Sequence, residues 1–518
     1  MKRRTFLHRA SHALAAPAVM GSFGFTSSRR FSSFLRAQAE SGKVLVLIYL
    51  QGGNDGLNTV IPLDQLSALN LVRPHVILPE NKLLPISGTE LAFHPALDGF
   101  STLYKEGKLK IIQSVGYPEQ NYSHFRSTDI WMSGSDSDQL VSSGWPGRYL
   151  NHEYPDYPEG FPNATDPDPL SIEIGYGSSM LFQGPATSMS MVLKDPTSFH
   201  ELIDNVEEES PDTYAGDKLK HIRLTARQSQ LYGEVVKQAA NKVTSQQHYP
   251  DNNELAQQLK IVARLISGGL KTPLYMVRLG GFDTHAAQVM ASDHTLGEHA
   301  SLLADLDNAV KAFMNDIEFM GLGDNVLGMT FSEFGRRIIS NASLGTDHGA
   351  AAPLFVFGNQ VEKGVLGTNP VIPAAATFKD NLPWQFDFRQ VYGSVLEQWF
   401  GMQLQDRASV LMSDFSTLPI IGEDVITAVR PDVEQSRLKV YPNPVAEMAT
   451  IDFISSGAPM KIEAIDMLGR PVGHIFSGVL AHGNQSLQWN TRELPAGNYY
   501  VLMQSESTRR TVGVVKLN

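Results

Sequence analysis

The chain has 518 residues, 42% of them hydrophobic and 19% charged, a balance that lets most of it bury enough apolar surface to fold. Its formal net charge of −12 argues against nucleic-acid binding, which needs a concentrated basic face. Because the sequence contains no cysteine, disulfides, thiolate metal sites and a cysteine nucleophile are excluded, and any metal must be held by His, Asp, Glu or Asn.

Residues 1–40 have the features of a twin-arginine-type export signal. Within residues 1–7, paired arginines precede an aromatic residue and a leucine, and a modest apolar stretch follows. A small-x-small cleavage site is available at Ala37-Gln38-Ala39. No other stretch reaches the roughly 18 to 20 consecutive apolar residues that a membrane span needs. We therefore expect an exported protein without a transmembrane segment in the mature chain, the alternative being an ordinary basic N-terminus.

Apolar runs alternate with helical periodicities along the body of the chain. The pattern predicts helices at 97–104, 255–266 and 302–319, and strands at 44–50, 109–115, 274–279, 326–331 and 354–357. The first strand is a continuous apolar run, typical of a parallel strand covered on both faces. Between about 133 and 215 the sequence loosens into Gly, Ser, Pro and Asp, which indicates insertions and loops over the sheet edge. The alternation predicts an α/β domain over 41–428, with a mainly parallel sheet flanked by helices.

The composition changes near residue 430, where we place a linker at 429–437. From 438 to 518, short apolar segments are separated by Gly, Pro and Asn turns. The segments are 438–441, 449–453, 461–466, 486–489, 499–504 and 511–517. Regular short strands of this kind predict a small all-β sandwich, and it contains no evident catalytic cluster.

Four polar clusters follow predicted strands of the body. They are Asn54-Asp55, Asp283-Thr284-His285, Ser332-Glu333 and Asp347-His348. Because strand ends converge at one edge of an open α/β sheet, residues far apart in sequence can meet there. Gathered carboxylates and imidazoles suit zinc, manganese or a similar divalent ion. A structural polar network is the alternative, and spacing alone does not decide between the two.

One further candidate lies just after the second predicted strand, in the segment 121–127. Ser123 could be a nucleophile activated by a metal, with His124 or Arg126 near a bound anion. Alternatively, Ser123 caps a helix and its neighbours pack a loop.

Several phrases resemble the bacterial family called domain of unknown function 1501. They are Leu50-Gln51-Gly52-Gly53-Asn54-Asp55-Gly56-Leu57-Asn58-Thr59, Ser123-His124-Phe125, Gly280-Gly281-Phe282-Asp283-Thr284-His285, Ser332-Glu333-Phe334-Gly335-Arg336-Arg337 and Gly345-Thr346-Asp347-His348-Gly349. The resemblance spans roughly residues 44 to 425. That family is similar to the alkaline phosphatase and sulfatase superfamily, whose members hold metals at strand ends and attack phosphate or sulfate esters with a Ser or Thr.

The resemblance implies roles for the polar clusters. Asp55 takes the place of the first-strand metal ligand, Asp283 and His285 match an Asp–His ligand pair, and His348 resembles the late metal histidine. Ser123 becomes the best candidate for the nucleophile.

The sequence departs from the superfamily pattern at Ser332-Glu333, where an Asp-His pair is usual. Glu333 could still ligate a metal through oxygen. Alternatively, Asp347-His348 supplies that pair and Glu333 plays a supporting role. Arg336 could pair with an anionic substrate group through its planar fork, or form a salt bridge to a carboxylate of the protein itself.

The C-terminal segment from about 436 resembles the type A sorting domain of the type IX secretion system. Its phrases are Tyr441-Pro442-Asn443-Pro444, Asp466-Met467-Leu468-Gly469-Arg470 and Leu494-Pro495-Ala496-Gly497-Asn498-Tyr499-Tyr500. The resemblance implies handling by the type IX secretion machinery and export through the periplasm to the cell surface or the medium.

Together these features predict an exported or cell-surface, metal-dependent hydrolase of phosphate or sulfate esters acting on an anionic substrate. The divalent ion would be zinc, manganese or calcium. Its candidate ligands are Asp55, Asp283, His285, Glu333, Asp347 and His348, and the candidate catalytic residues are Ser123, His124 and Arg336. The alternative is a non-catalytic surface binding or structural protein that keeps a degenerate sulfatase-like fold.

Overall fold

A computed structural model describes residues 42–175, 177–194, 231–422, 439–455, 459–466, 470–481, 483–505 and 509–517. The predicted export signal and the predicted linker lie outside these ranges. The chain divides into two compact units, Met1–Glu423 and Asp424–Asn518, which are described separately. Among the helices within the described ranges, none has both the length and the apolar character needed to cross a bilayer.

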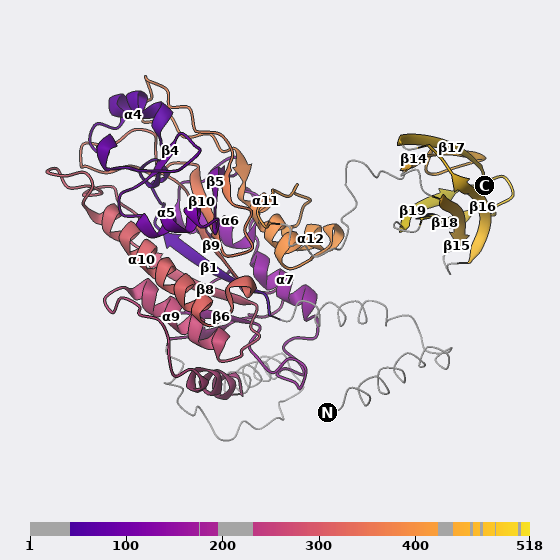
Figure 1. The fold of residues 1–518 in the computed structure, drawn as a ribbon, viewed down its shortest axis with the longest axis horizontal. Helices are drawn as coiled ribbons and strands as arrows, with labels where there is room; N and C mark the ends of the chain where they lie inside the picture. Colours follow the sequence, from indigo (N-terminus) through magenta and orange to yellow (C-terminus); the bar gives the residue numbers. More distant parts are fainter. Residues whose placement is uncertain are drawn as a thin grey trace. The chain divides into compact units, whose positions relative to one another are not determined.

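The larger unit is built on a nine-stranded sheet in the order β11-β5-β10-β9-β1-β8-β6-β7, with β12 also paired to β5 (Figure 1). The pairings are parallel except for the two that β10 makes with β5 and β9. This arrangement confirms the predicted α/β fold with a mainly parallel sheet. The strands are β1 (Val44–Gln51), β5 (Leu109–Gly116), β6 (Ser171–Ile174), β7 (Met191–Leu193), β8 (Leu274–Gly280), β9 (Val326–Phe331), β10 (Ala352–Phe357), β11 (Gly364–Leu366) and β12 (Phe386–Asp387).

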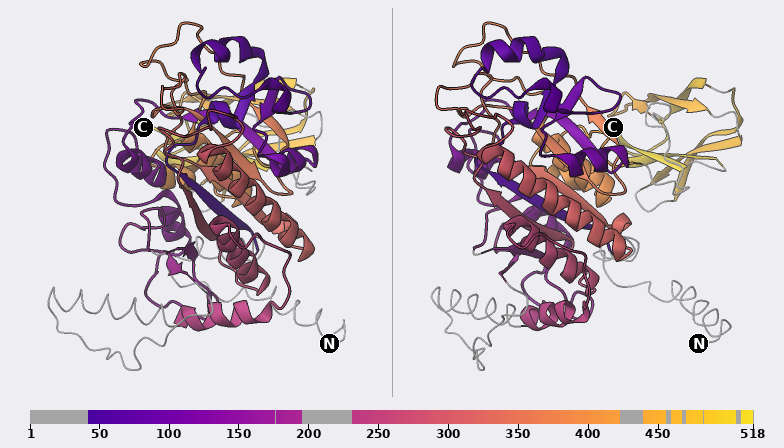
Figure 2. Two further views of the ribbon diagram at one scale, coloured as in Figure 1. Left: turned by 90° about the vertical axis from the view of Figure 1, so that its left-hand side faces the viewer. Right: turned by 60° about the vertical axis from the view of Figure 1, so that its left-hand side comes forward.

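Helices cover both faces of this sheet. One face packs against α5 (Asp98–Lys105), α9 (Glu254–Ser267) and α10 (Glu298–Phe319), and α9 and α10 lie side by side along it (Figures 1 and 2). The other face packs against α6 (His124–Ser133), α7 (Trp145–Glu153), α11 (Phe388–Ser394) and α12 (Leu404–Leu411). The predicted helices at 97–104, 255–266 and 302–319 are thereby confirmed.

Strand β1 shows why its sequence is apolar throughout. Val46 and Ile48 point into the core beneath α9 and α10, whereas Leu45 and Leu47 point into the opposite core. All four are at most 1% exposed. Full burial of such a side chain contributes about 1.5–3 kcal/mol, so a strand buried on both faces favours a continuous apolar run over an alternating one.

A small three-stranded sheet follows β1 in the chain. It consists of β2 (Val60–Pro62), β4 (Leu91–Phe93) and β3 (Leu84–Pro85), and its apolar residues share a core with α3 (Gly56–Thr59) and α4 (Leu66–Val72). Short 3-10 helices lie at Leu63–Gln65, Glu80–Lys82 and Gly323–Asn325, and a π-helical turn spans Val395–Trp399.

The segment predicted as loops over the sheet edge, about 133–215, contributes helix α7 and two strands, and its residues 176 and 195–215 lie outside the described ranges. β6 pairs in parallel with β8, with Ile172 opposite Tyr275, and β7 pairs with β6. The prediction of insertions alone was therefore wrong for these residues. The strands are four and three residues long, which is too short for a recognisable hydrophobic period, and they are stabilised by the neighbouring strand.

The direction of β10 brings the polar clusters together. The carboxyl ends of β1, β5, β8 and β9 lie at one edge of the sheet, as the pairings of Gln51 with Gly280 and of Tyr49 with Phe331 indicate. Since β10 is antiparallel, its amino end lies at the same edge, with Ala352 opposite Val115. The loops after four strands and the loop before a fifth therefore converge.

The smaller unit is a β-sandwich, as predicted. One sheet has the order β13-β14-β17 and the other β16-β15-β18-β19, and residues from both form one apolar core (Figure 1). Strand β16 was not predicted, because its residues are exposed or half-buried and include two glycines. The strands are β13 (Lys439–Tyr441), β14 (Met448–Ser455), β15 (Pro459–Asp466), β16 (Pro471–Val479), β17 (Gly483–Asn490), β18 (Gly497–Ser505) and β19 (Arg509–Lys516).

Candidate metal centre

Asp283 occupies the middle of a polar cluster at the convergent edge. Its Oδ1 lies 2.9 Å from Nδ1 of His285 and 3.0 Å from Nε2 of His348, and its Oδ2 lies 3.3 Å from Nε2 of His124. Arg336 donates a hydrogen bond of 2.7 Å to the same Oδ1. Partial burial opposes ionisation, but the hydrogen bond and positive charge of Arg336, together with the contact to His348, outweigh it and lower the pKa of Asp283 to about 2. The carboxylate is therefore charged at neutral pH.

The imidazole of His348 is oriented by the backbone. Its Nδ1 lies 2.8 Å from the carbonyl oxygen of Tyr122. A carbonyl only accepts hydrogen bonds, so Nδ1 carries a proton and donates. In the neutral ring, Nε2 then presents its lone pair to Asp283.

His124 is oriented in the same way by a carboxylate. Its Nδ1 lies 2.8 Å from Oε1 of Glu333, and that hydrogen bond, outweighing partial burial, raises the pKa of His124. Its Nε2 is buried and has no hydrogen-bond partner, although it faces Asp283. The rings of His124 and His348 are 4.4 Å apart between centroids.

This geometry fits a divalent metal ion. One ligand atom from each of His124, Asp283 and His348 can be chosen so that all lie within 4.8 Å of one another, and no other such group of three occurs among the residues that the structure describes. Two imidazole lone pairs facing one carboxylate repel it unless a cation lies between them, and two imidazolium rings this close would repel each other. Two imidazoles and a carboxylate are also a common three-ligand set for zinc, leaving a fourth position open.

Two of the predicted ligands lie apart from this group. Asp55 is 1% exposed and forms an ion pair with buried Arg73, and Gln288 Nε2 donates to its Oδ2 at 2.6 Å. Asp347 is exposed, and its Oδ1 accepts a hydrogen bond of 3.1 Å from Asn341. Neither carboxylate belongs to the convergent group.

Two other predicted ligands contact the group without belonging to it. Nδ1 of His285 lies 2.9 Å from Oδ1 of Asp283, and the side chain is 44% exposed, which leaves its ring open to solvent. Glu333 is completely buried, and its carboxylate accepts from the backbone N–H of Gly52 and faces His124.

Arg336 is engaged entirely by the protein. Its side chain is 0% exposed and, besides Asp283, it donates to the carbonyl oxygens of Gly52, Gly53, Phe282 and Thr346. This matches the second of the two interpretations of Arg336, a salt bridge to a carboxylate of the protein. The neighbouring Arg337 was not predicted as a site residue. It is half-buried, and its guanidinium lies 5.3 Å from the ring centre of Tyr122. Two adjacent arginines carry no signal of which one is buried.

Ser123 directly precedes α6 in extended conformation. It stands at the N-cap position, but its side chain makes no capping hydrogen bond. The residue is exposed, and its backbone N–H donates to Oδ1 of Asn121 at 2.8 Å. Ser123 is thus adjacent in the chain to the ligand candidate His124, with an accessible hydroxyl.

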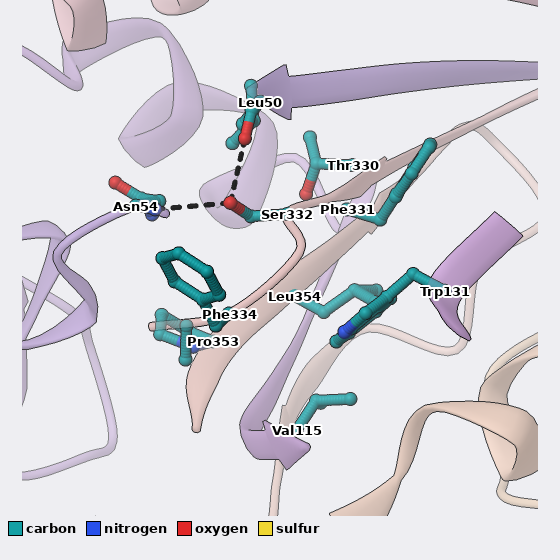
Figure 3. A pocket seen from close by; sticks show the side chains of 11 residues that line it. Leu50, Asn54, Val115, Trp131, Thr330, Phe331, Ser332, Phe334, Pro353 and Leu354 are labelled. Carbon is teal, nitrogen blue, oxygen red and sulfur yellow. Dashed lines mark hydrogen bonds between the residues drawn. The ribbon is translucent and has the colours of Figure 1, made fainter. Parts of the chain in front are cut away.

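Ser332, the remaining polar residue after β9, joins the ends of two strands. Its hydroxyl donates to the carbonyl of Leu50 at 2.7 Å and accepts from the backbone N–H of Asn54 at 3.1 Å (Figure 3). It borders a small pocket whose other walls are mainly apolar, including Trp131 and Phe334 (Figure 3). None of the residues of the convergent group lines this pocket, but its wall residue Phe334 packs against the rings of His124 and His348, with centroids 4.9 and 4.5 Å away.

Comparison with solved structures finds similar chains at low sequence identity. A protein of the alkaline phosphatase superfamily from Vibrio parahaemolyticus is 10% identical, with a TM-score of 0.32 over 91% of this chain and 79% of that one. A chain from Bacteroides thetaiotaomicron connected with the metabolism of multiple glycosaminoglycans is 8% identical, with a TM-score of 0.34 over 86% and 89%. A sulfatase from Pseudoalteromonas sp. is 10% identical, with a TM-score of 0.32 over 90% and 88%. A search of curated proteins found no match.

Two family models match parts of the chain. The C-terminal match, to a secretion system C-terminal sorting domain, covers residues 439–516 and implies secretion or display at the cell surface. The other match includes β8, β9 and β10, together with the candidate ligands Asp283 and His348. The chain thus combines a segment, residues 204–396, that matches the family described as protein of unknown function (DUF1501) with a C-terminal secretion sorting domain.

Proposed function

We propose that the protein is an exported, metal-dependent hydrolase of phosphate or sulfate esters. The observation that carries this proposal is the convergence of His124, Asp283 and His348, with two Nε2 atoms aimed at one carboxylate. The ring nitrogens that do not face Asp283 are oriented by Glu333 and by a backbone carbonyl, as is usual for metal-binding histidines. The proposed ion is zinc or manganese, since imidazole nitrogen is a poor ligand for calcium.

A bound divalent ion would supply Lewis acidity that polarises an ester oxygen and favours deprotonation of a nucleophile. The protein would contribute position and charge. The exposed hydroxyl of Ser123, next in the chain to His124, is our candidate nucleophile. For the anionic part of the substrate we assign Arg337 in place of Arg336, because Arg337 is partly accessible whereas the donors of Arg336 are all directed at the protein.

The test begins with the metal content of the full chain purified without chelators. Wild type is compared with His124→Ala plus His348→Ala, and with His285→Ala, which removes an imidazole outside the convergent group. We expect bound metal in wild type and in His285→Ala, and its loss in the double variant. A metal-free wild type that is well folded would refute the proposal.

Hydrolysis of a panel of aryl phosphate and sulfate esters then separates catalysis from binding. Turnover that is lost in Ser123→Ala and in the metal-free double variant is the expected result. Bound metal without any turnover would favour the alternative of a non-catalytic surface binding protein. Two observations favour that alternative. Asp55 is paired with Arg73 and Arg336 with Asp283, so neither side chain is free to contact a substrate or an ion.

A further inference from the structure

Glu333 stands where the resemblance implied a metal ligand, but its surroundings fit a different task. The side chain is 0% exposed, and both carboxylate oxygens receive the backbone N–H of Gly52, at 2.9 and 3.2 Å. Oε1 also lies 2.8 Å from Nδ1 of His124. The carboxylate therefore joins the end of β1, the end of β9 and the start of α6.

The direction of the hydrogen bond follows from the partners. A carboxylate is an acceptor, so His124 donates through Nδ1, which leaves Nε2 as the ring nitrogen available to a metal. That Nε2 is the atom facing Asp283, 3.3 Å from Oδ2. Without Glu333 nothing in these contacts would hold the ring with Nε2 toward Asp283, and a ligand that is not oriented binds a metal more weakly.

Within the described ranges, the other predicted carboxylates do not converge with further ligand residues on a second position. Asp55 is buried against Arg73 and Gln288, and Asp347 faces solvent and Asn341. In the part of the chain that the structure describes, only one group of three ligand residues converges.

We infer that Glu333 is a positioning residue and not a metal ligand, and that it holds His124 with Nε2 toward Asp283 so that the site takes a single ion. This inference rests on the proposed metal site for its stoichiometry. The role of Glu333 toward His124 is independent of any bound metal, and the two can be tested apart.

The experiment uses the full chain after chelator treatment, as wild type, Glu333→Gln and Glu173→Gln. Glu173 is a matched control because it is also a buried carboxylate that accepts a backbone N–H, from Ser179, and it lies on β6 outside the convergent group. Zinc is titrated by calorimetry. We expect one equivalent in all three chains, with affinity lowered about 10- to 100-fold in Glu333→Gln only.

The Nδ1 proton of His124 is followed by ¹⁵N NMR in the metal-free chains. We expect it to exchange slowly with solvent in wild type and in Glu173→Gln, and faster in Glu333→Gln, because a neutral amide oxygen is a weaker acceptor than a carboxylate. If Glu333→Gln fails to fold, Glu333→Asp replaces it, since this variant keeps the charge but withdraws the acceptor and should also weaken zinc binding.

Two results would overturn the inference. One is two equivalents of zinc in wild type, with one of them lost in Glu333→Gln, which would make Glu333 a ligand. The other is unchanged exchange of the His124 Nδ1 proton in Glu333→Gln together with unchanged zinc affinity. A wild type that binds no zinc would refute the proposed function and the single-ion stoichiometry, whereas the NMR comparison would still decide the role of Glu333.

Discussion

Replacing Asp55 with asparagine tests whether this carboxylate stabilises the fold or holds a metal. Asp55 and Arg73 are 1% and 0% exposed and form an ion pair, and Arg73 also donates to the carbonyl oxygens of Arg337 and Ile338. Removing one partner of a buried ion pair costs about 3–5 kcal/mol, because it leaves an uncompensated buried charge. The retained amide oxygen can still accept from Gln288, which favours the lower end of that range.

We therefore expect Asp55→Asn to lower the free energy of unfolding by about 3 kcal/mol and to leave the bound metal unchanged. Urea unfolding is measured with and without chelator, since metal binding would itself add stability. Elemental analysis of the folded variant gives its metal content.

The control for this experiment is Glu318→Gln, which breaks an exposed ion pair with Lys108 in the same unit. Exposed pairs contribute less than about 1 kcal/mol, so this variant should unfold almost as wild type does. The opposite result is an Asp55→Asn variant that unfolds like wild type but has lost its metal. Asp55 would then be a metal ligand that gives up its pairing with Arg73 when the ion binds.

Three further predictions concern buried polar groups and the backbone near the site. Burial lowers the pKa of His299 to about 4 and that of His94 to about 3, below the ordinary value of 6.5. The stability that these neutral rings contribute is complete above about pH 6.5 and is lost as the pH falls toward 4. The free energy of unfolding of chelator-treated protein, measured with urea, should therefore decline over that interval, by about 3 kcal/mol for His299, and less steeply in His299→Gln. Gly52 has φ +124°, and a Cβ there would lie 2.4 Å from the backbone nitrogen of Asp283, the candidate ligand, so Gly52→Ala should lose metal as measured by elemental analysis. The control is Gly88→Ala, where φ is +79° and the space around the residue is open. This variant should be destabilised only by backbone strain and should keep its metal. A lysine at position 336 has too few donors for the five acceptors of Arg336. We therefore expect Arg336→Lys to lower the free energy of unfolding by more than about 3 kcal/mol, measured by thermal unfolding. An unchanged melting temperature would contradict this.

The main elements of the body were predictable because each carries a strong local signal. The continuous apolar run of β1 and the helical periods of α9 and α10 reflect burial that a strand or helix must satisfy wherever it lies in the fold. The short strands β6 and β7 carry no such signal, since neighbouring strands and not local preference stabilise them.

The convergence of polar loops could also be foreseen, since parallel strands end at one edge of a sheet. The choice among the candidate residues could not. Asp55 resembled a ligand by its place after β1, but a buried cation eighteen positions later, Arg73, pairs with it. Of the two adjacent arginines, Arg336 lies opposite His348 in an antiparallel bridge and is buried, while Arg337 is only half-buried.

The sequence by itself determined the α/β body, the C-terminal β-sandwich and the set of polar residues available at the edge of the sheet, because these follow from hydrophobic period and from the order of strands. Only the tertiary structure decided which of those residues face one another. The antiparallel β10 brings His348 to Asp283, and Glu333 directs His124 toward the same carboxylate. Such pairings depend on distances of about 3 Å between residues far apart in the chain, and no local pattern records them.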